Sequence, residues 1–114
     1  MGENRIKLVA ADMDGTLLNR ERKITKYTQD VIKKAMAQGV YFVPATGRAV
    51  NALPPELKEM EGIRYGIFSN GATIYDLKEE KVIYKNHFEM DRVLELMDFL
   101  KQFDLMESIS LNGQ

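Results

Sequence analysis

Two acidic side chains, Asp12 and Asp14, are separated by one residue and followed directly by Gly15 and Thr16. Glycine permits a sharp turn, so this spacing predicts two carboxylates on one tight loop. Two like charges in contact repel by on the order of 4 kcal/mol at an effective dielectric of about 20, which favours a cation between them. An ionised carboxylate can attack phosphorus without a base to activate it. The pattern is therefore typical of a phosphoryl-transfer site.

Two other kinds of acidic loop resemble this segment. A helix-loop-helix calcium site needs Gly at its sixth position and Glu at its twelfth. Counted from Asp12, the glycine comes too early and the twelfth residue is Lys23, which excludes that site. A solvated turn stays open for Asp-x-Asp-Gly alone, because Asp and Gly are ordinary turn residues. The apolar run before Asp12 and the Thr-Leu-Leu segment after Gly15 favour a functional site.

The acidic loop must be held by the element before it. Residues 6–11 are apolar except for Lys7 and predict a buried strand of a parallel sheet. Open α/β sheets bind ligands just beyond the carboxyl ends of such strands, where Asp12 lies. Thr25 is expected to cap a helix that runs to Gln38 and stops at Gly39. The apolar face of this helix is predicted to comprise Tyr27, Val31, Ile32, Ala35 and Met36.

The remaining segments continue the alternation of strands and helices. Residues 40–45 predict the second strand, and a helical segment after Gly47 is interrupted by Pro54 and Pro55, with a new helix to residue 61. Further expected elements are a strand at 65–69, a hairpin of 73–75 with 81–84, an amphipathic helix from Val93 to Phe103 and a last strand within 105–111. This order predicts the start of a doubly wound α/β fold. Thr46 and Asn70 then follow parallel strands beside Asp12, so the three converge at one edge.

Composition limits the classes of protein. The chain has 114 residues, 45% of them hydrophobic, and a formal net charge of -1, which predicts one modest soluble domain without affinity for nucleic acid. The absence of cysteine excludes disulfides and thiolate zinc sites. The apolar run near the N-terminus is too short for a signal sequence, and no segment reaches membrane-spanning length. A cytoplasmic location is therefore expected.

Three segments together resemble a known family. The Asp-x-Asp-Gly-Thr-Leu segment resembles the first signature of the haloacid dehalogenase superfamily of phosphatases. Residues 40–48, which end in Ala-Thr-Gly-Arg, resemble the second signature, and residues 68–72 resemble the Ser-Asn-Gly-Ala element of the Cof-like subgroup. The resemblance implies a partial doubly wound, Rossmann-like parallel sheet with a β-hairpin and the start of an α+β cap of type IIB. Residues 1–85 are then expected to be the N-terminal part of the core domain, and residues 86–114 the start of the cap.

The resemblance also assigns roles. Asp12 is implied to be the nucleophile that forms an aspartyl-phosphate, and Asp14 the general acid and base. Mg²⁺ is the implied cofactor, bound by a carboxylate oxygen of Asp12 and the backbone carbonyl of Asp14. Thr46, together with backbone N–H groups at the start of the following helix, is expected to hold a phosphoryl oxygen.

Further residues are weaker candidates for substrate binding. Gly47 and Arg48 follow Thr46, and Arg48 is equally a surface arginine. Asn70 and Gly71 are also a standard hairpin turn dipeptide, an interpretation compatible with substrate contact. His87 is interpreted as a solvated position in the linker between core and cap rather than as a catalytic group.

The third and fourth family signatures, a lysine and an acidic cluster, have no match here. The chain is therefore expected to be the N-terminal portion of a Mg²⁺-dependent phosphomonoester hydrolase, impaired in catalysis and acting on a small phosphorylated metabolite. The alternative is a noncatalytic remnant that binds phosphate or associates with itself. Because the strand at 6–11 would lack a neighbour on one side, self-association or pairing with a missing C-terminal portion is expected.

Overall fold

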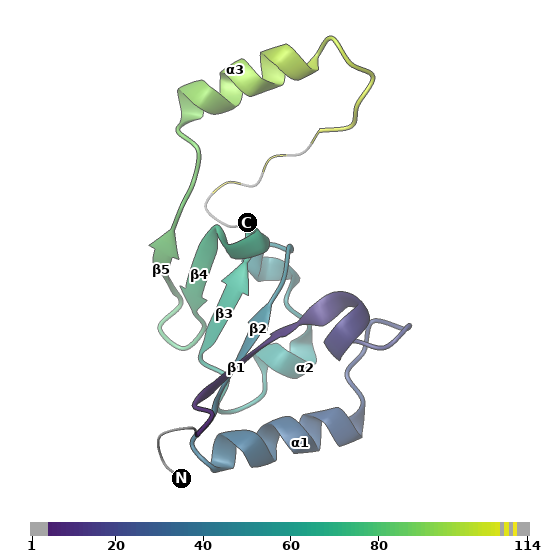
Figure 1. Ribbon diagram of the computed structural model, residues 1–114, viewed down its shortest axis with the longest axis vertical. Coiled ribbons are helices and arrows are strands. Elements are labelled where there is room, and N and C mark those ends of the chain that lie inside the picture. The colour runs from purple at the N-terminus through teal and green to yellow at the C-terminus, as the bar shows by residue number, and fades with distance from the viewer. Residues whose placement is uncertain (1–4, 108, 110, 112–114) are drawn as a thin grey trace.

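A single mixed sheet organises the chain in the computed structural model, which describes residues 5–107, 109 and 111 (Figure 1). Its five strands lie in the order β1-β2-β3-β4-β5. The first three are parallel, and the last two pairings are antiparallel. The strands are β1 (Leu8–Asp12), β2 (Tyr41–Ala45), β3 (Tyr65–Phe68), β4 (Thr73–Asp76) and β5 (Lys81–Lys85). The predicted α/β class with a β-hairpin is confirmed.

Three helices and three single helical turns connect the strands. The helices are α1 (Lys26–Ala37), α2 (Pro55–Lys58) and α3 (Met90–Leu100), and the turns are Met13–Leu17, Val50–Ala52 and Ser69–Gly71. Thr25 caps α1 as predicted, because its hydroxyl oxygen accepts a hydrogen bond from the Thr28 N–H at 3.2 Å. Gly39, with a φ of 88°, allows the chain to leave α1 towards β2. Pro55 occupies the first turn of α2, where its missing N–H is tolerated.

The hydrophobic core lies on the side of the sheet that faces α1 and α2. It joins Ile32 of α1 and Leu57 of α2 to Phe42 and Phe68 of the sheet. Met13, which follows β1, is also fully buried in this cluster. The residue between the two acids therefore anchors the acidic loop in the core.

The opposite side of the sheet is largely uncovered in the part of the chain that the structure describes. Leu8 and Tyr41 are register partners in β1 and β2, and each is 54% exposed. Tyr41 also packs against Tyr65, with ring centroids 6.2 Å apart. Tyr84 of β5 is half exposed as well. A doubly wound sheet normally has helices on both faces, so this chain shows one helical layer of the two.

Several sequence predictions require correction. The strand predicted to be buried is the exposed edge strand β1, because β2 is its only neighbour among the described residues. Tyr27 and Val31, predicted to lie on the apolar face of α1, are exposed. The face of α1 that packs against the core is the one with Ile32 and Met36, and Val31 lies about 100° around the helix from Ile32. The helix predicted to reach residue 61 ends at Lys58.

Helix α3 stands apart from the sheet, and none of its side chains is buried (Figure 1). The strand predicted within 105–111 is not formed at residues 105–107, and residues 108 and 110 lie outside the described residues. The proposed boundary between core and cap, at residues 85 and 86, coincides with the end of β5. The division into domains 1–85 and 86–114 stays a prediction.

Candidate active site

The ends of the three parallel strands bring the predicted residues together. Asp12 is the register partner of Ala45, so Thr46 follows β2 beside the acidic loop. The Thr46 N–H donates to the Ile67 carbonyl of β3 at 2.9 Å, and the Asn70 N–H donates to the Thr46 carbonyl at 3.1 Å. A cavity of about 300 Å³ is lined by Asp12, Ala45, Thr46, Gly47, Ile67, Asn70 and Gly71. Five of the seven predicted site residues line this one cavity.

The acidic loop folds back on itself directly after Asp12. The Oδ1 atom of Asp12 accepts a hydrogen bond from the Met13 N–H at 2.9 Å, while its Oδ2 atom lies 3.5 Å from the Thr16 hydroxyl. Gly15 has a φ of 77°, and the Leu18 N–H closes the loop on the Met13 carbonyl at 2.9 Å. One oxygen of Asp12 thus fixes the loop, and the other makes only a long contact.

Asp14 and Arg48 form a bidentate ion pair. The Nε atom of Arg48 donates to Asp14 Oδ2 at 2.9 Å, and its Nη2 atom donates to Oδ1 at 2.6 Å. Both side chains are only partly buried, with 51% of Asp14 and 30% of Arg48 exposed. This parallel arrangement is the strongest geometry for a guanidinium and a carboxylate. Arg48, predicted to bind substrate, therefore neutralises the second acid in this structure.

Thr46 organises the backbone after β2. Its side chain is buried, and its Oγ1 atom accepts a hydrogen bond from the Arg48 N–H at 3.0 Å. The Arg48 carbonyl in turn accepts from the Ser69 N–H at 2.9 Å, which ties the loop to the end of β3. The helix predicted to follow directly is only the turn Val50–Ala52, because the prolines that follow prevent a longer helix.

Gly47 and Asn70 approach each other closely across the cavity. A Cβ atom built on Gly47 would lie 2.7 Å from Asn70 Oδ1 and 3.3 Å from its Nδ2 atom. Asn70 and Gly71 have φ values of 55° and 95°, a conformation that Asn and Gly adopt most readily. They lie in the connection between the antiparallel strands β3 and β4, which confirms the predicted hairpin turn. Any side chain at position 47 would therefore displace the Asn70 amide from its present position.

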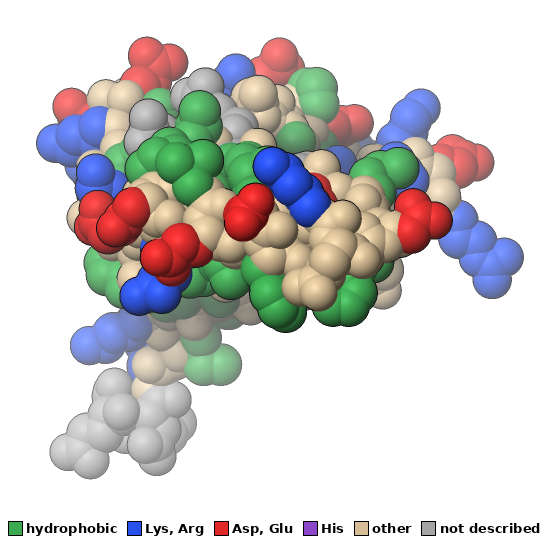
Figure 2. Space-filling model, turned by 90° about the horizontal axis from the view of Figure 1, so that it is seen from above, with side chains coloured by type: hydrophobic (Ala, Val, Ile, Leu, Met, Phe, Trp, Pro, Cys, Tyr) green, Lys and Arg blue, Asp and Glu red, His purple; other side chains and the backbone are tan. Residues whose placement is uncertain are grey.

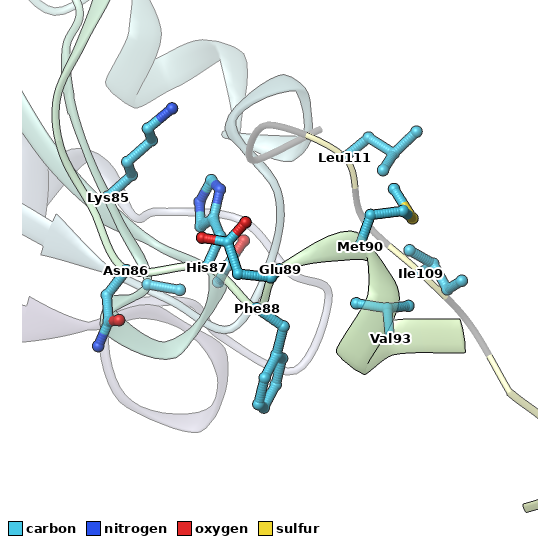
Figure 3. Close-up of a pocket in the computed structure, with 11 residues that line it drawn as sticks. Lys85, Asn86, His87, Phe88, Glu89, Met90, Val93, Ile109 and Leu111 are labelled. Carbon is cyan, nitrogen blue, oxygen red and sulfur yellow. The ribbon is translucent and has the colours of Figure 1, made fainter. Parts of the chain in front are cut away.

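His87 lies away from the acidic loop. Its Nε2 atom is 3.1 Å from the hydroxyl of the fully buried Thr73, so the exposed linker residue has a specific partner. Figure 3 shows His87 beside Lys85 and Glu89 in a separate cavity between β5 and α3. The structure gives His87 no contact with Asp12 or Asp14.

Two features of the structure were not predicted from the sequence. Asp76, almost fully buried, accepts hydrogen bonds from the Lys78 and Glu79 N–H groups and from the Arg64 guanidinium. The pKa of Asp76 is lowered, chiefly by the Glu79 N–H and then by Arg64. The spacing Asp-x-x-Glu at a hairpin turn is its only sequence signal. The second feature is a group of arginines beside Asp14 on the segment after the acidic loop.

The oxygen atoms at the acidic loop are of the type that binds a hard cation. The Asp12 carboxylate and the Asp14 carbonyl are oxygen donors, which Mg²⁺ prefers. Among the residues that the structure describes, no group of three or more His, Cys, Asp or Glu side chains gathers in a way that could hold a metal. These residues therefore fit Mg²⁺ in chemistry and would supply part of its coordination.

Known proteins that are similar in sequence to this chain include relatives from two bacteria. A relative from Buchnera aphidicola is 39% identical over 111 residues, which cover 95% of this chain and 39% of the relative. The 5-amino-6-(5-phospho-D-ribitylamino)uracil phosphatase of Bacillus subtilis is 37% identical over 89 residues, 75% of this chain and 36% of that protein. The chain thus spans less than two fifths of the length of these relatives.

A solved structure also matches the fold. A phosphatase of the haloalkanoate enzyme superfamily from Bacteroides thetaiotaomicron superposes with a TM-score of 0.75 and 31% identity, over 90% of this chain and 38% of the other. No helix of the described residues has the length and apolar character needed to cross a membrane. A profile of the haloacid dehalogenase-like hydrolases matches residues 9–113. The chain therefore belongs to the family of haloacid dehalogenase-like hydrolases.

Proposed function

We propose that this chain carries the nucleophile and the acid/base group of a Mg²⁺-dependent phosphomonoester hydrolase. The observation that supports it best is the cavity at the ends of β1, β2 and β3, where Asp12 lies with Thr46 and Asn70. Phosphatases among the similar proteins support the same reaction. The substrate is proposed to be a small phosphorylated metabolite, and the location to be the cytoplasm.

The first chemical step is attack by Asp12 on phosphorus. A bond forms between a carboxylate oxygen of Asp12 and the phosphorus atom, and the bond to the alcohol oxygen breaks. The leaving oxygen takes the electron pair and receives a proton from Asp14, which in this scheme is released from Arg48 and takes up a proton from solvent before the step. Water then attacks the aspartyl-phosphate, gives a proton to Asp14 and releases inorganic phosphate, so that both acids return to their starting state.

Arg48 regulates access to Asp14 in this scheme. Its guanidinium holds both carboxylate oxygens of Asp14, so Asp14 can exchange protons with a substrate only after at least one of these hydrogen bonds is released. A phosphate ester also has two anionic oxygens that the Arg48 guanidinium can bind in a bidentate way. Substrate binding is therefore proposed to draw Arg48 from Asp14 to the phosphoryl group.

Other residues position the phosphoryl group. Thr46 is proposed to bind one phosphoryl oxygen, and Asn70 another through its amide, with Gly47 and Gly71 allowing close approach of the backbone. When bound by the Asp12 carboxylate and the Asp14 carbonyl, Mg²⁺ would offset the repulsion between the nucleophile and the phosphate.

Turnover of p-nitrophenyl phosphate tests this function. The native chain is expected to release p-nitrophenol only when Mg²⁺ is present, and Asp12→Asn is expected to abolish the release. Asp104→Asn, an exposed acid near the C-terminal end, is the matched control and should keep native activity. Equal hydrolysis by native chain and Asp12→Asn would contradict the proposal.

The noncatalytic alternative, association through the open sheet, is supported by one observation. The chain exposes 8895 Å², whereas a compact monomer of 13.1 kDa exposes about 6,400 Å². The excess is larger than the roughly 800 Å² that one partner buries in a standard interface, and the uncovered sheet contributes to it together with α3, which has no buried side chain. Figure 2, which views the molecule from the end at which α3 lies, shows hydrophobic side chains between charged ones there as well. We propose that the edge of β1 pairs with a second copy or with a separately supplied strand.

Light scattering at micromolar concentration tests this association. The native chain is expected to form dimers or larger species, and Leu8→Lys, which places a charge on the exposed edge strand, should weaken them. Tyr27→Lys is the control, because Tyr27 is 78% exposed on α1 and lies away from the edge. A native chain that stays strictly monomeric and unfolds cooperatively would contradict the association.

A further inference from the structure

A second cavity borders the acidic loop on the side of Asp14. Its volume is about 710 Å³, and its charged lining consists of Arg20, Arg22 and Arg48 with Asp14 as the only acid. Three guanidinium groups and one carboxylate give this lining a formal charge of +2. The cavity at the ends of β1, β2 and β3, which is lined by Asp12, contains none of these arginines. Positive charge is therefore concentrated on one side of the acidic loop.

The loop that carries Arg20 and Arg22 is held by its own hydrogen bonds. The side-chain oxygen of Asn19 accepts from the Glu21 N–H at 3.0 Å and from the Lys23 N–H at 2.9 Å. The Arg22 N–H donates to the Asn19 carbonyl at 2.9 Å, and the Asn19 N–H donates to the Lys23 carbonyl at 2.9 Å. These bonds close a tight turn around Asn19. The backbone that bears both arginines is thus ordered before any ligand binds, which lowers the entropic cost of binding.

The two loop arginines are not neutralised by the rest of the described chain. Among the described residues, neither Arg20 nor Arg22 has a carboxylate within 4.0 Å, whereas Arg48 is paired with Asp14. Glu21 lies between them in sequence but does not line the cavity. A guanidinium binds planar carboxylates and phosphates through paired hydrogen bonds. The cavity is therefore suited to an anionic group.

This cavity lies beside Asp14, the residue proposed to protonate the leaving group. On the proposed function, on which this inference rests, Asp14 protonates the oxygen of the departing alcohol. The alcohol must then lie on the Asp14 side of the phosphorus atom, which is the side of Arg20 and Arg22. We infer that this cavity binds a second anionic group, a carboxylate or a phosphate, on the alcohol portion of the substrate. Phosphomonoesters with such a second anion are the substrate class that the chain selects.

Three six-carbon phosphates that carry different groups at carbon 1, two of them cyclic and 6-phosphogluconate open-chain, test the inference. Glucose 6-phosphate has no second anion, 6-phosphogluconate has a carboxylate at carbon 1, and glucose 1,6-bisphosphate has a phosphate there. Their dissociation constants are measured by calorimetry in an Asp12→Asn background, in which no ester is consumed. With the arginines intact, at least one doubly anionic ligand should bind about tenfold more tightly than glucose 6-phosphate, as expected for one charge-assisted hydrogen-bonded contact.

Variants of the loop separate this site from the phosphate site. The double variant Arg20→Gln/Arg22→Gln should reduce the preference to within about twofold while the affinity for glucose 6-phosphate changes by less than about twofold. Arg92→Gln on α3 removes one positive charge elsewhere, which matches each single loop variant, and should leave the preference intact. Should the double variant fail to fold, each single glutamine variant is expected to reduce the preference by about threefold.

The outcomes are distinct. A preference for 6-phosphogluconate as well as for the bisphosphate assigns the cavity to carboxylates and phosphates alike, and a preference for one ligand assigns it to that group. Equal binding of all three, or a preference that survives loss of both arginines, overturns the inference and leaves the proposed function standing. Failure of all three ligands to bind contradicts the proposed function itself and the inference with it.

Discussion

Replacing Gly47 with alanine should separate phosphate binding from folding. The added methyl group would lie 2.7 Å from Asn70 Oδ1, whereas ordinary contact begins at 3.4 Å. The amide of Asn70 must therefore withdraw by about 0.7 Å, a movement that its side chain can make because the Asn70 backbone stays tied to the Thr46 carbonyl. The Gly→Ala change also reduces the entropy of the unfolded chain, so the free energy of unfolding should change by less than about 1 kcal/mol.

The affinity for phosphate should respond much more strongly. Loss of one hydrogen bond from the Asn70 amide to a charged oxygen costs about 1.5–3 kcal/mol, which corresponds to a loss of affinity of about 10-fold to 100-fold. Calorimetric titration with inorganic phosphate measures the affinity, and urea denaturation measures the stability.

Gly39→Ala is the control, because it should lower the stability but leave the phosphate affinity unchanged. Gly39 lies after α1 with a φ of 88° and no atom within 4 Å of a built Cβ atom, so backbone strain alone should lower the free energy of unfolding by about 1–2 kcal/mol. Its phosphate affinity should remain native. Native phosphate affinity in Gly47→Ala would refute the placement of Asn70 at the phosphoryl group, as would equal losses of affinity in both variants.

Three further predictions concern stability, pH and the metal. Phe68→Ala should lower the free energy of unfolding in urea by about 3–5 kcal/mol because the ring is fully buried, whereas Tyr27→Ala, at an exposed position, should change it by less than about 0.5 kcal/mol; equal effects would contradict the described core. The pKa of Asp76 is lowered by the Glu79 N–H and the adjacent guanidinium, so its stabilising effect is present above pH of about 4 and is lost as the pH falls below that value. Thermal unfolding between pH 7 and pH 2 should therefore show a steeper acid-induced loss in the native chain than in Asp76→Asn, and parallel curves would contradict this. Asp14→Asn should strongly reduce hydrolysis but leave Mg²⁺ binding unchanged in calorimetry, because the ligand from Asp14 is its backbone carbonyl. Mg²⁺ binding should be weak in both chains, since one side-chain carboxylate and one carbonyl are the identified ligands; tight binding to the native chain would reveal further ligands.

The order of elements could be predicted because its signals are local. Thr25 and Gly39 mark the ends of α1 through capping chemistry, and Pro55 marks the start of α2. The convergence of Asp12 and Thr46 follows from the parallel arrangement of strands that alternate with helices. These features depend on a few neighbouring residues or on a general rule of topology.

Burial could not be predicted in the same way. The residues of β1 are apolar, but whether they are buried depends on neighbours that the local sequence does not specify. Tyr27 and Ile32 are both suitable for a helical apolar face, and only the docking of α1 on the sheet distinguishes them. The ion pair between Asp14 and Arg48 joins residues 34 positions apart, so it too depended on the folded arrangement.

Chemical trapping of a phosphorylated side chain would identify the nucleophile. The native chain is incubated with Mg²⁺ and p-nitrophenyl phosphate, treated with borohydride and digested, and its peptides are examined by mass spectrometry. An aspartyl-phosphate at position 12 would be reduced to homoserine. We therefore expect this change in the peptide that contains Asp12, only when substrate is present and not in Asp12→Asn. Release of p-nitrophenol by the native chain without modification of Asp12, or with modification of Asp14 instead, would contradict the assignment of the nucleophile.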